Sequence, residues 1–593
     1  MRPATLLLFG PALVWSAAAA LGVVWTAADD AAWGPATARG TVVGSEDCRR
    51  CHEAQYESWH ASHHRTMNQR VADSGAIILA PFAGESLRTA GFEAVFSGGT
   101  TPHVRVTREQ DGAVVLDADV ELSVGTHRYQ QYVARIDRGG GPQERWRLPF
   151  AYHPEAQRWI HLGGGFLFPD LPDGDTQAYL RHFSRWNDNC VFCHNTEPVP
   201  GLQASGVFET EVGEIGIGCE ACHGPAQTHH ERHANPVRRL LSPLGDEGDG
   251  SITHPGRLSP QRHSDVCGRC HGQRIGKDLA QILEHGDGFT PGMALSQVSR
   301  PILAEARLAS DPEHARPFQA RFWPDGTPRL SAYEYQGLIL SPCYDEGRGL
   351  SCGDCHTMHG EEPDMQLRAG ADTDAACVGR CHDAADYADH GGHETVGCQG
   401  CHMPRTTYGL LRGMISHRIT TPEPGALVGR DDAPDACTQC HVDQARSWAA
   451  VSMQALGLRG VAAPTDDGAP RISRVERDLV GGDPVQRALA AHALARPEAV
   501  GARERRVRAL VDALEDDYPA VRWFAHRGLL ALVTRPALRA WLDRFDFMAD
   551  VSERIVVVDA LRDAVGPSVA SQDPALWESL VAHRDDVAIA IGE

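Results

Sequence analysis

The chain is poor in basic residues, and after its N-terminus it has no long apolar run. Its 593 residues carry 56 Lys and Arg against 78 Asp and Glu, a formal net charge of −22. Because an acidic surface repels a phosphate backbone, no nucleic acid partner is expected, whereas basic redox proteins remain compatible with this charge. A chain of this length can form several domains.

Charge is also scarce at the N-terminus. Residues 1–28 contain one charged side chain, Arg2, and end in the small residues Thr26-Ala27-Ala28. The segment is typical of a signal peptide or of an uncleaved N-terminal anchor. It is long enough to span a bilayer, while its small residues favour cleavage. In either case we expect the rest of the chain in the periplasm or elsewhere outside the cytoplasm.

Cysteine is the most informative residue type. Sixteen of the 17 cysteines form pairs that are directly followed by histidine; seven pairs enclose two residues and one encloses three. The motifs are Cys48, Cys51, His52; Cys190, Cys193, His194; Cys219, Cys222, His223; Cys267, Cys270, His271; Cys352, Cys355, His356; Cys377, Cys381, His382; Cys398, Cys401, His402; and Cys437, Cys440, His441.

Each motif is typical of a c-type haem attachment site. The two thiols bond to the vinyl groups of one porphyrin, and the adjacent imidazole becomes the proximal ligand of its iron. Zinc ribbons and disulfides also use Cys-x-x-Cys pairs. Neither requires the histidine, which follows all eight pairs although His makes up only 30 of 593 residues. The sequence therefore predicts eight covalently attached haem c groups.

Cys343 is the one cysteine outside the pairs. It is either a buried thiol that packs like a small apolar side chain, or a redox group or ligand beside the Cys352 haem.

The motif positions divide the chain into parts. Alternation over Val104 to Thr107, with a turn at Asp111-Gly112, predicts a β-hairpin. The expected parts are a signal peptide or anchor (1–28), a first haem segment (44–75), a β-rich insertion (76–165), a haem-packed cytochrome domain (166–450) and a HEAT-like helical repeat domain (471–593).

The last two parts differ in periodicity. From 166 to 450 the periodicity of apolar residues along the sequence is weak. We therefore expect short helices and little regular structure there, with porphyrins supplying the apolar core. The tail repeats Pro484 and Arg487 as Pro519 and Arg522, 35 residues on, and a weaker copy carries Arg554. This period predicts an α-solenoid with a protein-binding face. The expected fold class is a mainly α multihaem cytochrome c with a β-rich insertion and a C-terminal α-solenoid.

The motifs and the residues between them resemble the octahaem c-type cytochromes of bacterial periplasms that carry a TPR- or HEAT-like tail. The first haem segment resembles that of the tetrahaem cytochrome that accepts electrons from hydroxylamine oxidoreductase. The resemblance spans residues 44–450 and rests on Trp59-x-x-Ser62-His63-His64, Tyr129-Gln130-Gln131-Tyr132, Arg158-Trp159-Ile160-His161-Leu162, Cys219 to Pro225 with His229, Cys355 to His359, Cys401 to Pro404 with His417, and Ala436 to His441 with Trp448.

Two features depart from the pattern of such proteins. The Cys377 motif has three intervening residues where two are usual. No attachment motif ends in lysine, so the catalytic site of pentahaem nitrite reductases is not reproduced.

The sixth position on each iron separates two hypotheses. A second histidine gives a saturated iron suited to electron transfer, whereas an open position allows a small molecule to bind and react. The matching segments imply four distal ligands: His64, His229, His359 and His417. Further candidates, for which a surface or hydrogen-bonding role is the alternative, are His263, His393 and His161.

We expect an electron carrier with mostly bis-histidine haems. Its redox partners would be a quinol oxidase-type membrane donor or a soluble cytochrome, and a further protein could bind the helical tail. The alternative is an oxidoreductase that reduces or oxidises a small nitrogen or sulfur compound at one haem with an open axial position. A third interpretation is a haem-bearing scaffold whose helical tail is the operative part.

Overall fold

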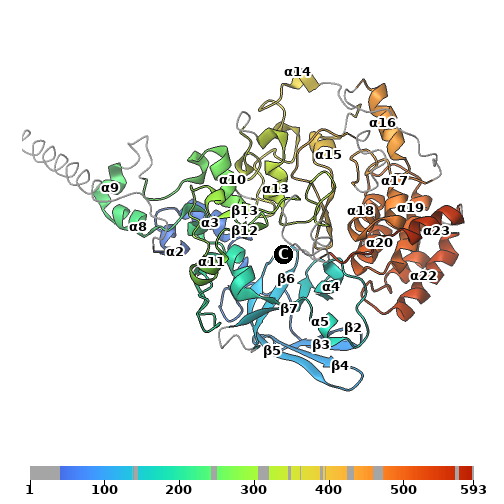
Figure 1. Cartoon of the computed structure of the whole chain (residues 1–593), viewed down its shortest axis with the longest axis horizontal. Coiled ribbons are helices and arrows are strands. Elements are labelled where there is room, and N and C mark those ends of the chain that lie inside the picture. The colour runs from blue at the N-terminus through green and yellow to red at the C-terminus, as the bar shows by residue number, and fades with distance from the viewer. Residues whose placement is uncertain are drawn as a thin grey trace, which may run out of the picture.

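The protein was analysed as a computed structural model, which describes residues 41–136, 138, 144–241, 250–304, 320–344, 349–360, 362–387, 392–393, 396–423, 433–457, 472–567 and 573–589. Figure 1 shows three parts: an antiparallel sheet, a loop-rich region that carries the Cys-His motifs, and a group of packed helices near the C-terminal end. Residues 1–28, where a signal peptide or anchor is expected, lie outside the described residues. No described helix is long and apolar enough to cross a membrane.

The β-rich region is an antiparallel sheet in which strands that follow each other in sequence are neighbours. Its order is β2-β3-β4-β5-β6-β7-β8, with β1 paired to β5 and β9 to β7. The strands are β1 (Asn68–Arg70), β2 (Glu85–Thr89), β3 (Phe92–Ser97), β4 (His103–Arg108), β5 (Val114–Val124), β6 (Gln130–Arg135), β7 (Arg145–His153), β8 (Arg158–His161) and β9 (Ser184–Arg185).

Alternating side chains explain this sheet. Buried and half-buried residues alternate along β3, as they do in a strand with one face on a core. On the core face Phe96 stacks on Trp159, with ring centres 3.6 Å apart. The hairpin expected around Asp111-Gly112 is present, since Val104 pairs with Ala118 across it. The prediction of a β-rich region is therefore confirmed.

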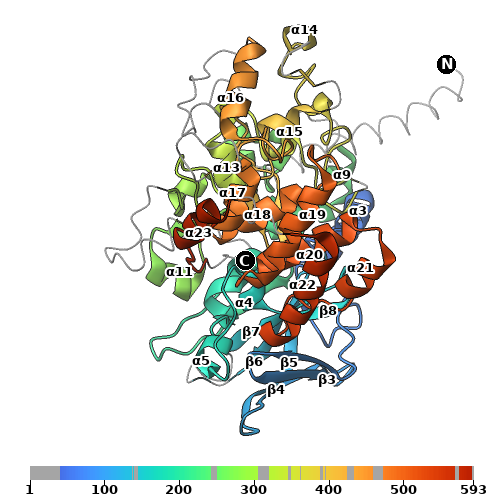
Figure 2. The same cartoon turned by 90° about the vertical axis from the view of Figure 1, so that its right-hand side faces the viewer.

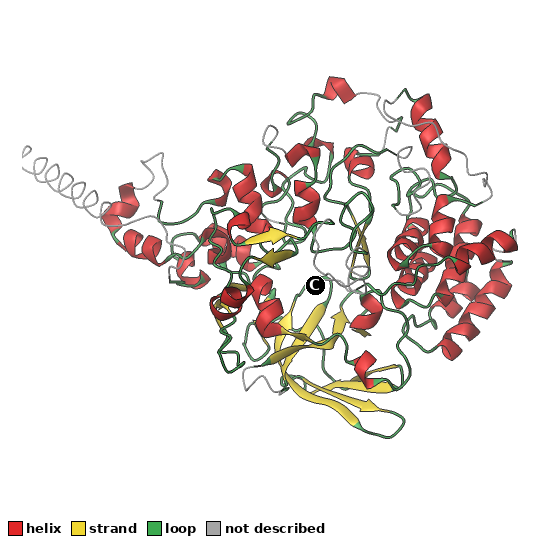
Figure 3. Ribbon diagram, in the orientation of Figure 1, coloured by secondary structure: helices red, strands yellow, loops and turns green. Residues whose placement is uncertain are grey.

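Between the sheet and the C-terminal helices regular structure is short and loops dominate (Figure 3). The helices of the motif-bearing segments are α2 (Ser45–Arg49), α3 (Glu53–His60), α4 (Leu162–Gly165), α5 (Thr176–Tyr179), α6 (Val191–His194), α7 (Cys219–His223), α8 (Gln227–Ala234), α9 (Pro236–Leu241), α10 (Pro260–Gly268), α11 (Leu279–His285), α13 (Glu334–Ile339), α14 (Ala384–Tyr387), α15 (Cys398–His402) and α16 (Arg446–Ala455). Three small hairpins are β10 (Asn195–Val199) with β11 (Glu211–Ile215), β12 (Arg274–Gly276) with β13 (Ser299–Pro301), and β14 (Thr407–Gly409) with β15 (Arg412–Met414). Single turns of other helix types are η1 (Trp186–Cys190), η3 (Pro255–Arg257), η4 (Leu295–Gln297), η5 (Pro342–Tyr344), η6 (Cys352–Asp354) and η7 (Asp374–Ala376).

The C-terminal part is helical. Its elements are α17 (Arg474–Gly481), α18 (Pro484–Ala495), α19 (Arg503–Asp512), η9 (Ala513–Glu515), α20 (Pro519–Leu532), α21 (Pro536–Leu542), α22 (Val551–Val565) and α23 (Pro574–Ala582). Pro484 and Pro519 occupy the first helical position of α18 and α20, where a missing backbone N–H costs nothing. These two helices pack on each other.

The repeated arginines of the tail have one structural role. Arg487, Arg522 and Arg554 are all buried. Each guanidinium donates to a backbone carbonyl five or six residues before it, in the loop that enters its own helix: Gly482, Asp516 and Ala549. The recurrence seen in the sequence therefore marks equivalent helix entrances.

Charged contacts join the tail to the segment that follows the sheet. Asp170 accepts hydrogen bonds from Arg522 at 2.6 and 3.1 Å and from Arg554 at 2.6 Å. Beside it, α4 packs against α20 on one side and against β7 and β8 on the other (Figures 1 and 2). Asp170 thus neutralises two buried cations of the tail at once.

We predict that Asp170→Asn destabilises this junction by roughly 2–4 kcal/mol, because it leaves two buried guanidinium groups facing a neutral amide. This range allows for the 38% exposure of the Asp170 side chain, which screens the charge. Urea unfolding followed by far-UV circular dichroism measures the change. The control is Asp543→Asn, whose carboxylate is 63% exposed and 3.7 Å from Arg539. Equal unfolding midpoints for the two variants would contradict the prediction.

Candidate haem sites

The eight Cys-His motifs fold into similar tight turns. We number them by their histidines: site 1 His52, site 2 His194, site 3 His223, site 4 His271, site 5 His356, site 6 His382, site 7 His402 and site 8 His441. In sites 1, 4, 5 and 8 the carbonyl oxygen of the first cysteine accepts two backbone hydrogen bonds. One comes from the second cysteine at 3.1 or 3.2 Å and the other from the histidine at 2.8 or 2.9 Å. In sites 3 and 7 the motif lies on α7 and α15, and in site 2 it runs from Cys190, the last residue of η1, to the end of α6.

Site 6 keeps this pattern despite its additional residue. The Cys377 carbonyl accepts from the backbone N–H of Cys381 at 3.2 Å and of His382 at 3.1 Å. Gly379 takes up the extra length in the left-handed region, with φ +81°, and no heavy atom lies within 4 Å of an added Cβ. Since glycine adopts this conformation without a steric penalty, the longer motif can present the same two thiols and imidazole.

Four of the motif histidines face a second imidazole across a gap. Metal–imidazole bonds are about 2 Å long, so two imidazoles on opposite sides of one metal have ring centres about 6 Å apart. The observed pairs and separations are His52 with His229 at 6.3 Å, His223 with His359 at 6.2 Å, His271 with His64 at 6.1 Å and His441 with His393 at 6.1 Å. These residues fit haem groups with two axial histidines.

Backbone carbonyls hold several proximal rings in one orientation. The Nδ1 atoms of His223, His356 and His402 lie 2.9, 3.0 and 3.0 Å from the carbonyl oxygens of Thr253, Met365 and Thr420. A ring that donates from Nδ1 leaves Nε2 free for a metal, which is the usual support of a histidine ligand.

Burial favours the neutral form of three of the histidines, His64, His194 and His417, and the neutral form is the one that binds metal. Desolvation lowers the pKa of His64 to about 4 and that of His194 to about 4, because burial penalises the charged ring. It also lowers the pKa of His417, whose neighbours include Glu334 and His356. The His271 ring of site 4 is a further neighbour, so His417 lies near sites 4 and 5.

Two other predicted histidines have different surroundings. His263 packs on the site 5 turn, with its Cε1 atom 1.8 Å from where a Cβ on Gly353 would lie. His161 uses both ring nitrogens in hydrogen bonds, since Nε2 is 2.9 Å from the Tyr179 carbonyl oxygen and Nδ1 accepts from Gly163. In this position His161 stabilises the start of α4.

Hydrogen bonds join the turns of different sites. The Ser45 hydroxyl, three residues before Cys48, accepts from the backbone of Cys219 at 2.9 Å. Glu220, within the site 3 motif, is fully buried and accepts from the backbone of Gly44 at 2.8 Å. The Cys48 and Cys219 side chains also lie close together. Sites 1 and 3 are thus neighbours, although site 2 lies between them in sequence.

Similar contacts link sites 5, 6 and 7. Arg380 of site 6 pairs with Asp354 of site 5. Asp374, just before site 6, accepts from the backbone of Cys398 in site 7 at 2.6 Å. Porphyrins bonded to adjacent turns would have edges close together.

Cys343 lies near the segments of both site 5 and site 6. Its carbonyl oxygen accepts from the backbone N–H of Leu350, two residues before Cys352, at 3.2 Å. Burial, followed by the charges of Asp374 and Cys343, raises the pKa of Cys377. Cys343 is half-buried within η5. A role of this thiol as a redox group or ligand beside the Cys352 haem, or as a packed apolar side chain, stays a prediction.

The chain was compared with known proteins. A family model described as cytochrome c554 and c-prime matches residues 47–80 and 175–224, which contain the motifs of sites 1, 2 and 3. A solved structure described as outer cell wall cytochrome OcwA is 14% identical and aligns with 88% of this chain and 100% of its own, with a TM-score of 0.46. An undecahaem cytochrome from the S-layer of Carboxydothermus ferrireducens is 13% identical and aligns with 90% of this chain and 69% of its own, with a TM-score of 0.31. No curated protein matches the chain. The family match supports haem c as cofactor and electron transport as the class of function.

We predict that replacing the ring opposite His52 opens one axial position. The variant is His229→Ala with His233→Ala, because the His233 ring centre lies 4.6 Å from that of His229 and could replace it. One low-spin signal should be lost and one high-spin signal gained in the electron paramagnetic resonance spectrum of the oxidised protein.

The matched control is His230→Ala, an exposed residue of the same helix, α8. Its spectrum should equal that of the unmodified protein. The assignment is wrong if the double variant retains every low-spin signal.

Proposed function

We propose that this protein is an extracytoplasmic octahaem c-type cytochrome that transfers electrons along closely packed haems. Haem c would be bonded to the sixteen paired cysteines, with the histidine of each motif as proximal ligand. The observation that carries the proposal is the set of four imidazole pairs whose ring centres lie 6.1 to 6.3 Å apart. Iron with two axial histidines is suited to electron transfer.

The same pairs supply the proposed distal ligands. His229 would serve site 1, His359 site 3, His64 site 4 and His393 site 8. For site 5 the proposed ligand is His417, which burial keeps neutral near His356. Bound haem supplies the reversible one-electron chemistry of its iron. The chain orients the ligands through backbone carbonyls and brings neighbouring sites into contact.

Redox partners would recognise the acidic surface. A formal net charge of −22 favours a partner with basic residues around its own redox centre, through long-range attraction before contact. A soluble basic cytochrome and a quinol-oxidising membrane donor both meet this condition. The resemblance to octahaem cytochromes and the N-terminal segment support a position outside the cytoplasm.

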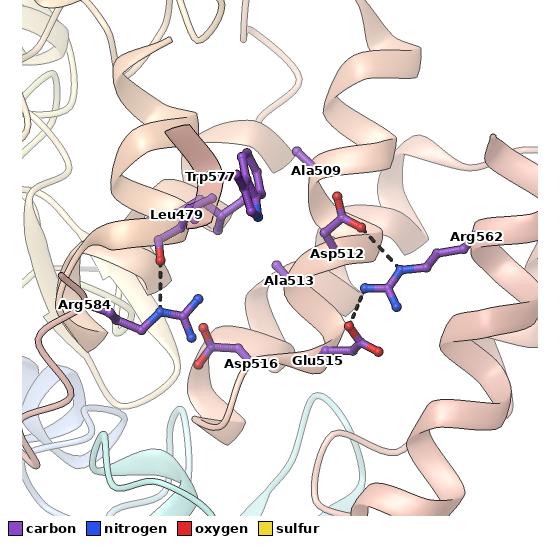
Figure 4. Close-up of a pocket in the computed structure, with 10 residues that line it drawn as sticks. Leu479, Ala509, Asp512, Ala513, Glu515, Asp516, Arg562, Trp577 and Arg584 are labelled. Atoms are coloured by element: carbon purple, nitrogen blue, oxygen red, sulfur yellow. Dashed lines mark hydrogen bonds and ion pairs between the residues drawn. The ribbon is translucent and has the colours of Figure 1, made fainter. Parts of the chain in front are cut away.

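The C-terminal helices would offer a further protein-binding face, as a HEAT-like repeat. They line a half-open pocket of about 370 Å³, drawn in Figure 4. Arg562 reaches from α22 to Asp512 and Glu515 at one end, while Trp577 forms an apolar wall. A mixed charged and apolar lining of this kind suits the side chains of a partner protein.

We predict eight haems per chain in the purified protein. Cys377→Ser with Cys381→Ser should leave seven, because the longer motif keeps the hydrogen bonds of the others. Gly379→Val should lower the occupancy of this site alone, since valine is strained at φ +81°. Intact mass and the pyridine haemochrome absorbance give the count.

The control is Gly457→Val. Gly457 also has positive φ, +72°, with no heavy atom within 4 Å of an added Cβ, and it lies outside the motifs. Eight haems are expected in this variant. Seven haems in the unmodified protein would show that site 6 is not used.

The carrier hypothesis predicts that low-spin signals dominate the electron paramagnetic resonance spectrum of the oxidised protein, because two histidines saturate an iron. Added nitrite, hydroxylamine or sulfite should leave the spectrum unchanged. A high-spin signal that shifts with one of these compounds would instead favour the oxidoreductase.

A further inference from the structure

The attachment turn of site 8 is paired with the loop that joins α18 to α19. The backbone N–H of Val500 donates to the Cys440 carbonyl oxygen at 2.7 Å, and the N–H of Val442 donates to the Val500 carbonyl oxygen at 3.2 Å. His441 and Val500 thus form an isolated β-bridge. Val442 is 2% exposed and belongs to the same apolar cluster as the C-terminal helices. The helical tail therefore forms one side of a haem site.

A second backbone contact joins site 8 to the start of the tail. The N–H of Arg474, the first residue of α17, donates to the Gln444 carbonyl oxygen at 3.0 Å. The N–H of Gln444 in turn donates to the carbonyl oxygen of His441, also at 3.0 Å. Two separate segments of the tail, α17 and the loop between α18 and α19, thus hold the residues at and after the site 8 histidine.

Buried charges continue from site 8 into α17. The carboxylate of Asp435, just before the site 8 motif, accepts from the Thr438 hydroxyl at 2.6 Å and from the Thr438 backbone N–H at 2.8 Å. The Arg446 Nε atom lies 3.5 Å from Oδ2 of Asp435. On α17, Arg474 pairs with Asp478 at 2.7 Å. The four charged residues are each at most 7% exposed, so solvent and salt screen them little.

Arg446 is the group on which these charges act together. Burial and the charge of Arg474 lower the pKa of Arg446. The carboxylates of Asp435 and Asp478 raise it. The side chain is a cation throughout, because a guanidinium group is not deprotonated in proteins. A cation near a haem favours the reduced iron, which carries one positive charge less, whereas an anion favours the oxidised iron.

We propose that the helical tail is a structural part of haem site 8 and sets the reduction potential of its haem through the charges that meet at Arg446. The inference rests on the proposed function, because it requires a haem bonded to Cys437 and Cys440. Leu479 and Val480, which line the pocket drawn in Figure 4, directly follow Asp478 on α17. A partner protein seated in that pocket would therefore contact the helix whose charge acts on site 8.

The test is a potentiometric titration of the full holoprotein followed by electron paramagnetic resonance. His393→Ala identifies the signal of site 8, because the His393 ring faces His441 and its loss converts one low-spin signal into a high-spin signal. Arg446→Gln should lower the midpoint potential of the site 8 signal, since a buried cation is lost. Asp478→Asn should raise it, since a buried anion is lost. Arg446→Lys, which keeps the charge, should restore the potential of the unmodified protein.

The matched control for the charge variants is Asp516→Asn. Asp516 is also in the tail, is 7% exposed and pairs with Arg487 at 2.8 Å. Its side chain accepts a further hydrogen bond from the Tyr518 backbone at 2.9 Å. The variant therefore disturbs a buried ion pair of the same kind, and the site 8 potential should stay unchanged.

Val500→Pro tests the backbone contact independently. Proline has no N–H, so the variant loses the 2.7 Å hydrogen bond to Cys440. We expect the site 8 signal to shift or disappear while the other signals remain. The control is Ala502→Pro in the same loop, where φ is −61° and suits proline. Its spectrum should equal that of the unmodified protein.

Three results would overturn the inference. In the first, Arg446→Gln does not lower the site 8 potential. In the second, Asp478→Asn does not raise it. In the third, Val500→Pro leaves the site 8 signal as it is in the unmodified protein. Failure of the proposed function itself gives a different result, because the unmodified protein would then lack attached haem.

Discussion

At five of the sites, 1, 4, 5, 6 and 8, the attachment turn depends on one backbone carbonyl group, that of the first cysteine in the motif. By accepting from the next cysteine and from the histidine, it closes a turn that holds two thiols and one imidazole together. The turn requires these two hydrogen bonds, not a fixed number of residues between the two cysteines. Site 6 shows this, because Gly379 adopts a left-handed backbone conformation and the Cys377 carbonyl still accepts from the N–H groups of Cys381 and His382. A motif with a longer spacing therefore remains chemically equivalent.

The motif-bearing region is bounded by parts that have ordinary protein cores. The sheet has its own apolar cluster, and a larger one extends from α4 into the C-terminal helices. Around site 4 the buried apolar cluster has only four members, Val266, Phe289, Leu295 and Tyr335. A small apolar core, together with buried ion pairs such as Arg269 with Asp287, is expected where cofactors supply most of the apolar volume.

Local features were predictable from the sequence. The Cys-His motifs, the hairpin around Asp111-Gly112 and the repeated arginines of the tail each depend on residues close together in the chain. The sequence also indicated all four histidines that face a motif histidine, but not which one faces which. His229 lies opposite His52, and His359 opposite His223, only because distant segments meet. The sequence did not indicate the buried network of Arg269, Asp287 and Glu197, since isolated charged residues are usually on the surface.

Local and distant contacts therefore have separate roles. The turns determine which side chains each site presents, whereas contacts between turns determine which sites are neighbours. Glu220 illustrates the second role: it is buried in the site 3 motif and binds the backbone just before site 1, across 176 residues. Because the large sheet occupies the chain between sites 1 and 2, the first segment can fold back onto α7 while site 2 stays against the sheet. Sites 1 and 3 therefore meet in space although site 2 separates them in the sequence.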